Sequence, residues 1–229
     1  MVDLATSLPA ALQKGQSIAL IVNGAIHDYE RIRSLIQPYD AVVAVDGGLI
    51  HCHALNLHPQ LIIGDLDSIN PILLEKYRGV PIQKYPVEKD ETDLELAIRT
   101  VYHSEVKKIA LFGALERRID HALANLHVMR RFPDCVVIET ENETVFALKG
   151  SKRISCHPGQ TVSLIPLGPS PRGVTTKGLK WELHDATLDK NFFSLSNISL
   201  SSEFEITIAE GDLVCMLKRE PFPLTQRKS

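Results

Sequence analysis

The chain has 229 residues, of which 44% are hydrophobic and 23% are charged, as in ordinary globular proteins, so extended disorder is not expected. Its formal net charge of -3 argues against a general nucleic-acid binder, because such proteins usually carry a basic stripe. No apolar run reaches the roughly 20 residues that span a bilayer, and residues 1–16 lack the pattern of a secretory signal. We therefore expect a cytoplasmic protein with one large domain or two small ones.

Strands and helices alternate through the first part of the sequence. Short apolar runs predict strands at residues 17–22, 41–45, 61–63, 82–85, 108–112 and 135–139. Helical patterns fall between them, at residues 29–36, near 51–55, and at 71–77, 94–102 and 120–132. Asn70 and Thr92 are placed to cap two of these helices. The alternation predicts a mainly parallel sheet with helices on both faces, which is a three-layer α/β domain.

The pattern changes after about residue 140, where helical periodicity ends. Apolar runs at residues 144–148, 161–166, 174–183, 192–195, 204–209 and 213–218 are separated by Gly, Pro, Asn and Ser. Phe204, Ile206 and Ile208 alternate with polar residues, as in a strand with one face in water. We therefore predict an α/β domain at residues 1–140 and an antiparallel β-sandwich at residues 141–229.

Two acidic clusters mark element boundaries in the first domain. Asp65 and Asp67 directly follow the strand expected at residues 61–63, and Asp93 opens the helix at 94–102. Ligands of open α/β sheets bind at the carboxyl ends of the strands. Three carboxylates converging there suit a hard cation such as Mg²⁺, which usually also holds substrate phosphates. The clusters favour phosphate chemistry, although each one taken alone also fits a capped turn or helix end.

Residues 113–125 join a strand end to a helix start. A helix N-terminus attracts anions, and the planar guanidinium of Arg118 is suited to a phosphate. His121 and Asn125 are four residues apart, so they share a helix face. The alternative interpretation is a solvated, charged loop with Asp120 as the N-cap.

The second domain offers fewer candidates. Trp181 is the only tryptophan of the chain, and Ser196 and Asn197 lie between two apolar runs. From these residues alone, the sequence favours Trp181 as a core residue and Ser196-Asn197 as a turn.

Taken in order, these segments resemble the thiamine pyrophosphokinase family. The family joins an α/β nucleotide domain to a β-sandwich, which matches the predicted layout. One departure concerns the small residues, often Gly-Gly, that usually precede the arginine of the Arg-x-Asp-His motif, because this chain has Glu116 and Arg117 there. The matching segments are Asn23-Gly24, Asp46-Gly47-Gly48, Gly64-Asp65-Leu66-Asp67-Ser68, Lys89-Asp90-Glu91-Thr92-Asp93-Leu94-Glu95, Arg118-Ile119-Asp120-His121 with Asn125, and Ser196-Asn197.

The resemblance implies transfer of a pyrophosphoryl group from ATP to the hydroxyl of thiamine, giving thiamine diphosphate and AMP. It implies that Asp65, Asp67 and Asp93 bind Mg²⁺ and that one of them, or Asp120, accepts the hydroxyl proton. The implied charge-neutralising residues are Lys89 and Arg118. The implied nucleotide site comprises Asn23, Gly24, Asp46, Gly47, Gly48, Thr92, His121 and Asn125. The implied thiamine contacts are Trp181, Ser196 and Asn197, in a homodimer whose sites need both chains.

Three other functions remain open from the residues. A pyrophosphokinase for another heterocyclic alcohol, such as a pterin, needs the same carboxylates. A nucleotide- or thiamine-binding sensor without turnover is suggested only by Glu116 and Arg117, and it has little need of three metal-directed carboxylates. A metal-dependent phosphohydrolase would use the same ligands and release phosphate without an acceptor.

Overall fold

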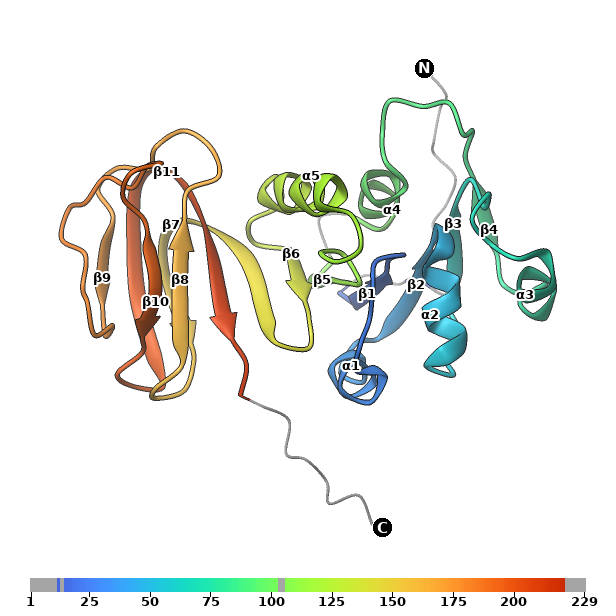
Figure 1. Ribbon diagram of the computed structural model, residues 1–229, viewed down its shortest axis with the longest axis horizontal. Helices are drawn as coiled ribbons and strands as arrows, with labels where there is room; N and C mark the ends of the chain where they lie inside the picture. The colour runs from blue at the N-terminus through green and yellow to red at the C-terminus, as the bar shows by residue number, and fades with distance from the viewer. Residues whose placement is uncertain (1–11, 13–14, 103–105, 221–229) are drawn as a thin grey trace, which may run out of the picture. The chain divides into compact units, whose positions relative to one another are not determined.

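The computed structural model describes residue 12 and residues 15–102 and 106–220 (Figure 1). The chain divides into two compact units. Unit 1 comprises Met1–Val128 and Cys135–Glu139, and unit 2 comprises Met129–Asp134 and Thr140–Ser229. Among the described residues, no helix is both long enough and apolar enough to cross a membrane.

The described residues of unit 1 form six strands in the order β6-β5-β1-β2-β3-β4, and every neighbouring pair is parallel. Strands β2 to β4 extend from one side of β1, whereas β5 and β6 extend from the other. The strand order therefore reverses between β1 and β5, where open α/β sheets bind their ligands. The strands are β1 (Ser17–Ile21), β2 (Ala41–Val45), β3 (Leu61–Gly64), β4 (Ile82–Lys84), β5 (Lys108–Phe112) and β6 (Val136–Glu139).

Helices cover both faces of this sheet. Figure 1 shows α4 (Asp93–Val101) and α5 (Ile119–Arg130) on the side opposite α1 (Tyr29–Ile36). The core on the α1 side also receives side chains from α2 (Leu49–Ala54) and α3 (Pro71–Lys76). A short 3₁₀ turn, η1 (Asp46–Gly48), joins β2 to α2. The predicted three-layer α/β fold is confirmed, because the central strands are buried on both faces.

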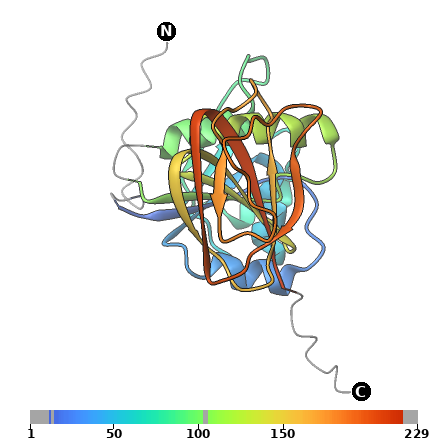
Figure 2. The ribbon, with the colours of Figure 1, turned by 90° about the vertical axis from the view of Figure 1, so that its left-hand side faces the viewer.

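Unit 2 is antiparallel. Its strands lie in the order β10-β8-β11-β7, and β9 also pairs with β11. Figure 2 shows its strands from a second direction. Phe204, Ile206 and Ile208 lie in its buried core, as their alternation predicts. The strands are β7 (Glu143–Ser155), β8 (Thr161–Ile165), β9 (Thr175–Lys177), β10 (Ser194–Ile198) and β11 (Glu203–Lys218).

The extent of two strands in unit 2 was predicted wrongly. The runs at residues 204–209 and 213–218 form the single strand β11, whose register against β7 shifts between Ile208 and Leu213. A bulge of this kind bends a strand without ending its pairing. Similarly, β7 continues beyond the predicted residue 148 to Ser155. Polar residues and a glycine were interpreted as strand ends, whereas pairing with a long partner keeps them in the strand.

Candidate functional site

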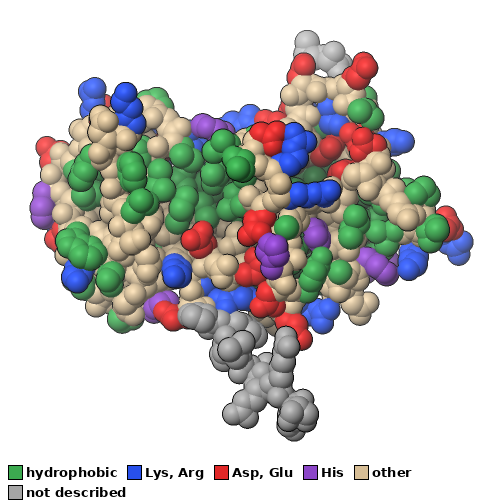
Figure 3. All heavy atoms as spheres, viewed as in Figure 1, with side chains coloured by type: hydrophobic (Ala, Val, Ile, Leu, Met, Phe, Trp, Pro, Cys, Tyr) green, Lys and Arg blue, Asp and Glu red, His purple; other side chains and the backbone are tan. Residues whose placement is uncertain are grey.

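Unit 1 has a cavity of about 410 Å³ at the carboxyl ends of its strands, a volume that suits a small-molecule ligand. Asn23 and Gly24 line it after β1, Asp46 after β2, and Gly113 after β5. The cavity therefore lies where the strand order reverses. Other predicted site residues that line it are Lys89, Thr92, Asp93, Arg118, His121 and Asn125. Figure 3 shows acidic and basic side chains side by side on the surface of this unit.

Three carboxylates meet beside the cavity. Asp46, Asp65 and Asp67 each offer one oxygen, and these oxygens all lie within 4.8 Å of one another. Gly64 makes this approach possible, because a Cβ on it would lie 2.9 Å from the Cβ of Asp46. Asp46 and Leu66 have φ values of 46° and 68°, in the left-handed region that non-glycine residues rarely adopt. Such strain is concentrated at functional sites.

Of the two Asp46 carboxylate oxygens, only one has a hydrogen-bond partner among the described residues. Ser68 Oγ donates to Asp46 Oδ2 at 2.6 Å. Asp46 Oδ1 is buried, and within the described part of the chain it has no hydrogen-bond partner. A buried, unpartnered carboxylate oxygen is unfavourable unless a donor or cation fills its place. Because hard cations prefer carboxylate oxygens, the donor set fits Mg²⁺.

Lys89 separates Asp93 from this group. Its Nζ lies 3.2 Å from Asp65 Oδ2 and 3.1 Å from Asp93 Oδ1. Burial works against the charge of Lys89, but Asp93 and Asp65 outweigh it, so the Lys89 pKa is raised. Burial also raises the Asp93 pKa, and Lys89 offsets only part of that effect. The structure thus groups Asp46 with Asp65 and Asp67, and pairs Asp93 with Lys89.

The pKa values of Asp65 and Asp67 are shifted in opposite directions. Burial raises the Asp65 pKa, but the Asp67 backbone N–H, which donates at 3.2 Å, and the Lys89 ammonium together bring it below its usual value. The Asp67 pKa is raised, chiefly by the charge of Asp65. A carboxylate disfavoured by a like charge gains from a nearby cation. This pair is therefore arranged to attract positive charge.

The loop before α5 is organised by its own polar groups. Arg118 Nε donates to Asp120 Oδ1 at 3.1 Å, and Arg118 Nη2 contacts the other oxygen. This pairing lowers the pKa of the exposed Asp120, which makes it a weak base. Asn125 is buried, and its Nδ2 donates to the carbonyl of Ala114 at 2.7 Å. Asn125 therefore shapes the cavity by holding the loop.

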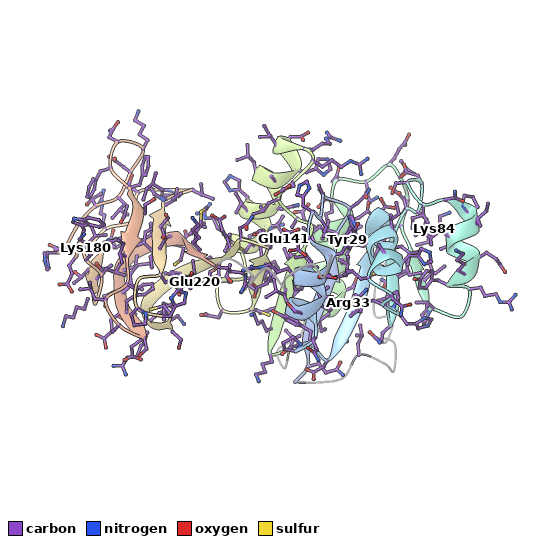
Figure 4. The ribbon with its side chains drawn as sticks, turned by 60° about the horizontal axis from the view of Figure 1, so that its bottom comes forward. Tyr29, Arg33, Lys84, Glu141, Lys180 and Glu220 are labelled. Atoms are coloured by element: carbon purple, nitrogen blue, oxygen red, sulfur yellow. The ribbon has the colours of Figure 1, made fainter. Side chains whose placement is uncertain are left out.

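The Asn23-Gly24 segment is hydrogen-bonded by His51, which the sequence patterns did not identify as a site residue. The carbonyl of Gly24 can only accept, so His51 Nε2 donates to it, at 2.7 Å. The neutral ring then accepts from Tyr29 Oη at Nδ1, also at 2.7 Å. Figure 4 labels Tyr29. No local pattern identifies His51, because its partners come from other segments.

The two glycines of the Asp46-Gly47-Gly48 segment do not line the cavity. A Cβ on Gly48 would lie 1.9 Å from the carbonyl oxygen of Ile21, so η1 packs directly on the end of β1. A Cβ on Gly47 would lie 2.3 Å from Asn23 Nδ2. Both positions need glycine because backbone and side chain approach so closely.

Glu116 and Arg117 line the cavity. In the sequence they were noted only because they depart from the family pattern, and they were not predicted as site residues. Glu116 contacts His27 Nε2 through a carboxylate oxygen. Arg117 Nη1 donates to the backbone and side-chain oxygens of Asn23 at 3.4 and 3.3 Å. Both residues therefore contact the segment after β1, Arg117 only through long hydrogen bonds.

The predicted thiamine contacts belong to unit 2. The interpretation of Trp181 as a core residue is wrong, because Trp181 is 55% exposed. Lys180, labelled in Figure 4, has its Nζ 4.7 Å from the Trp181 ring centroid. Asn197 is only 1% exposed, and it bonds both the N–H and the carbonyl of Trp181, at 3.1 and 2.7 Å. Ser196 lies within β10 at a φ of 53°, where the strand register is irregular. Asn197 thus positions Trp181.

Two family models match the chain, one for each half. "Thiamin pyrophosphokinase, catalytic domain" matches residues 32–139, and "Thiamin pyrophosphokinase, vitamin B1 binding domain" matches residues 148–213. A curated relative, "Thiamine pyrophosphokinase 2" of Arabidopsis thaliana, is 32% identical over 168 residues. That match covers 67% of this chain but only 62% of the relative, so the chain spans less than two thirds of its length.

Solved thiamin pyrophosphokinase structures have the same fold. The one from Geobacillus thermodenitrificans has a TM-score of 0.77 and 22% identity, covering 89% of this chain and 98% of its own. The one from Candida albicans has a TM-score of 0.75 and 21% identity, covering 90% of both chains. At these identities the likeness establishes the fold.

Proposed function

We propose that this chain, which belongs to the thiamin pyrophosphokinase family, transfers a pyrophosphoryl group from ATP to the hydroxyl of thiamine. The products are thiamine diphosphate and AMP. The observation that carries the proposal is the cavity at the reversal of strand order, beside which Asp46, Asp65 and Asp67 converge. Phosphoryl-type transfer needs positioning and charge stabilisation more than covalent chemistry from the protein, and this arrangement is suited to both.

The metal site is proposed on the carboxylate group. Asp65 and Asp67 are common to the sequence-based set and to the observed cluster, and Asp46 supplies a buried oxygen without a hydrogen-bond partner among the described residues. Mg²⁺ held there would neutralise charge on the triphosphate of ATP. Asp93, the third member of the sequence-based set, lies against Lys89 and is proposed to keep that ammonium in place.

The proton of the thiamine hydroxyl needs an acceptor. Asp120 is poorly suited, because Arg118 lowers its pKa. Asp93 is better suited, because burial raises its pKa and it lines the cavity. We assign Asp93 as the proton acceptor, and Lys89 and Arg118 as the cations that stabilise the transferring group. Asn23, Gly24, Thr92, His121 and Asn125 shape the ATP site around them.

Unit 2 is proposed to contribute the thiamine site. The exposed ring of Trp181 offers a face that attracts the cationic thiazolium. Ser196 lies one residue from Asn197, which bonds the Trp181 backbone. By the family resemblance, thiamine binds between unit 1 of one subunit and unit 2 of its partner.

A homodimer would also explain the surface of unit 2. Figure 3 shows hydrophobic side chains gathered over β8 and β10. Exposed apolar residues of this unit include Trp181, Phe192, Phe193, Leu195 and Leu200. Contiguous apolar surface of this kind commonly marks a protein–protein contact.

All four cysteines are free, which agrees with the proposed cytoplasmic location.

The proposal is tested by incubating the purified protein with ATP, Mg²⁺ and thiamine, and separating nucleotides and thiamine species. We expect AMP and thiamine diphosphate in equal amounts, and only when both substrates are present. ADP or phosphate formed without thiamine would instead indicate a phosphohydrolase. Turnover with a pterin alcohol and not with thiamine would assign another acceptor, and saturable binding without turnover would indicate a sensor.

A further inference from the structure

Three cationic side chains line the cavity of unit 1, and two of them are already neutralised. Lys89 lies between Asp65 and Asp93, and Arg118 is paired with Asp120. Arg117 differs, because its contacts are with the neutral oxygens of Asn23. Within the described residues it has no carboxylate partner. The cavity therefore presents one arginine whose charge is uncompensated.

We propose that Arg117 binds a phosphate group of the nucleotide, as a contact that this chain adds to the ATP site. The inference rests on the proposed function, and it concerns a position where the family usually has a small residue. An arginine fork matches phosphate oxygens in geometry and charge. Such charge-assisted hydrogen bonds are shorter and stronger than neutral ones.

The present contacts of Arg117 can be exchanged for better ones. Its distances to the two Asn23 oxygens, 3.4 and 3.3 Å, exceed the usual range for a strong hydrogen bond. A phosphate oxygen entering the cavity would offer a charged acceptor at shorter range. Little is lost when the guanidinium turns from Asn23 to the ligand.

The backbone at Arg117 supports a role for its side chain. Its φ is 92°, in the region that favours glycine. A glycine would relieve this strain, so a position with only a structural role would favour glycine. Residues held in such conformations concentrate where the side chain serves function.

The loop around Arg117 is held in place. Asn125 bonds the carbonyl of Ala114 on one side, and Glu116 contacts His27 on the other. Arg117 is therefore presented to the cavity by an ordered segment, which reduces the entropy lost on binding. The contact with phosphate then needs only a side-chain rotation.

The test compares Arg117→Gly and Arg117→Lys with the wild type by calorimetric titration of Mg·ATP and of adenosine. For Arg117→Gly we expect ATP binding about tenfold weaker, unchanged adenosine binding, and a melting temperature equal to or above that of the wild type. Arg117→Lys keeps the positive charge but lacks the planar guanidinium, so its ATP affinity should lie between those of the wild type and Arg117→Gly. Arg78→Ala is the matched control, since it removes an exposed cation of unit 1 that does not line the cavity.

Either of two results would overturn the inference. The first is wild-type ATP affinity in Arg117→Gly. The second is an equal loss of ATP and adenosine affinity, which would indicate a displaced loop. The two proposals fail separately: a wild type that binds ATP but makes no thiamine diphosphate defeats the proposed function, whereas an active enzyme indifferent to Arg117→Gly defeats only this contact.

Discussion

The environment of individual oxygen atoms distinguishes the carboxylates at the candidate site. Asp46 Oδ1 is buried without a hydrogen-bond partner in the described part of the chain, and Asp67 is disfavoured by its neighbour Asp65. Asp93 Oδ1 is buried too, and it lies 3.1 Å from the Lys89 ammonium. Carboxylates that look equivalent in the sequence therefore have different environments in the fold.

We expect Asp46→Asn and Asp67→Asn each to lower kcat by roughly 100-fold or more, because each removes negative charge from the proposed Mg²⁺ site. The fold should be retained, since the amide keeps the side-chain volume. Activity measured across a Mg²⁺ titration checks this, with the exposed carboxylate of Glu75 changed to Gln as the control. Wild-type activity in either aspartate variant would remove that residue from the metal site.

The partly buried His51 is expected to make the free energy of unfolding depend on pH. Burial lowers its pKa below the ordinary value of 6.5; its other polar neighbours are Tyr29, the Gly24 carbonyl and the charge of Arg117. Between the folded and unfolded pKa values the unfolded chain binds more protons, so stability rises with pH there. The contribution of neutral His51 is complete above about pH 6.5 and is lost as the pH falls through the folded pKa.

His51→Gln isolates this contribution, because the glutamine amide can still donate to Gly24 but does not titrate. Urea unfolding at pH 7.5 and 5.5 should show a larger loss of stability for the wild type than for the variant. Equal losses in the two proteins would mean that His51 is not kept neutral by the fold.

At the scale of elements, helix starts were the most predictable features. The boundaries of α1 agree with the prediction, and Asn70 and Thr92 cap α3 and α4 as expected. A cap is a local interaction among adjacent residues, so it is visible in the sequence. The continuous strand β11 could not be seen in the sequence, because it pairs with residues of β7 that lie 48 to 75 positions away.

The cap of α4 should contribute to stability and to the site together. Thr92 Oγ1 accepts from the Glu95 N–H at 3.2 Å, and Glu95 Oε2 accepts from the Thr92 N–H at 3.0 Å. Thr92→Ala should cost about 1 kcal/mol of unfolding free energy and raise KM for ATP, since Thr92 also lines the cavity proposed to bind ATP. Glu95→Gln preserves the capping box and serves as the control in denaturant unfolding. Unchanged stability in Thr92→Ala would show that the cap contributes nothing.

At the scale of the whole molecule, the proposed dimer places residues of two chains in one site. The predicted nucleotide and metal residues belong to unit 1, and the predicted thiamine contacts belong to unit 2. Variants defective in different units should then complement each other, because a mixed dimer contains one intact site.

Co-expression of Asp67→Asn with Trp181→Ala should restore about a quarter of wild-type activity, assuming random pairing into dimers. Asp67→Asn with Asp46→Asn is the control, because both changes affect unit 1 and no pairing yields an intact site. Activity assays of the purified mixtures, with light scattering for the oligomeric state, check the outcome. If recovery is absent although mixed dimers form, each site lies within one chain.

The α/β class, the antiparallel second half, the helix caps and the resemblance to one family could all be read from the amino-acid sequence. These features depend on periodicity, on adjacent residues and on the order of short motifs. Three features emerge only in the folded chain: Asp46 joins Asp65 and Asp67, His51 supports Gly24, and Trp181 is exposed. The physical reason is that these contacts join segments brought together by strand order, at backbone conformations such as those of Asp46 and Leu66 that local propensity does not favour.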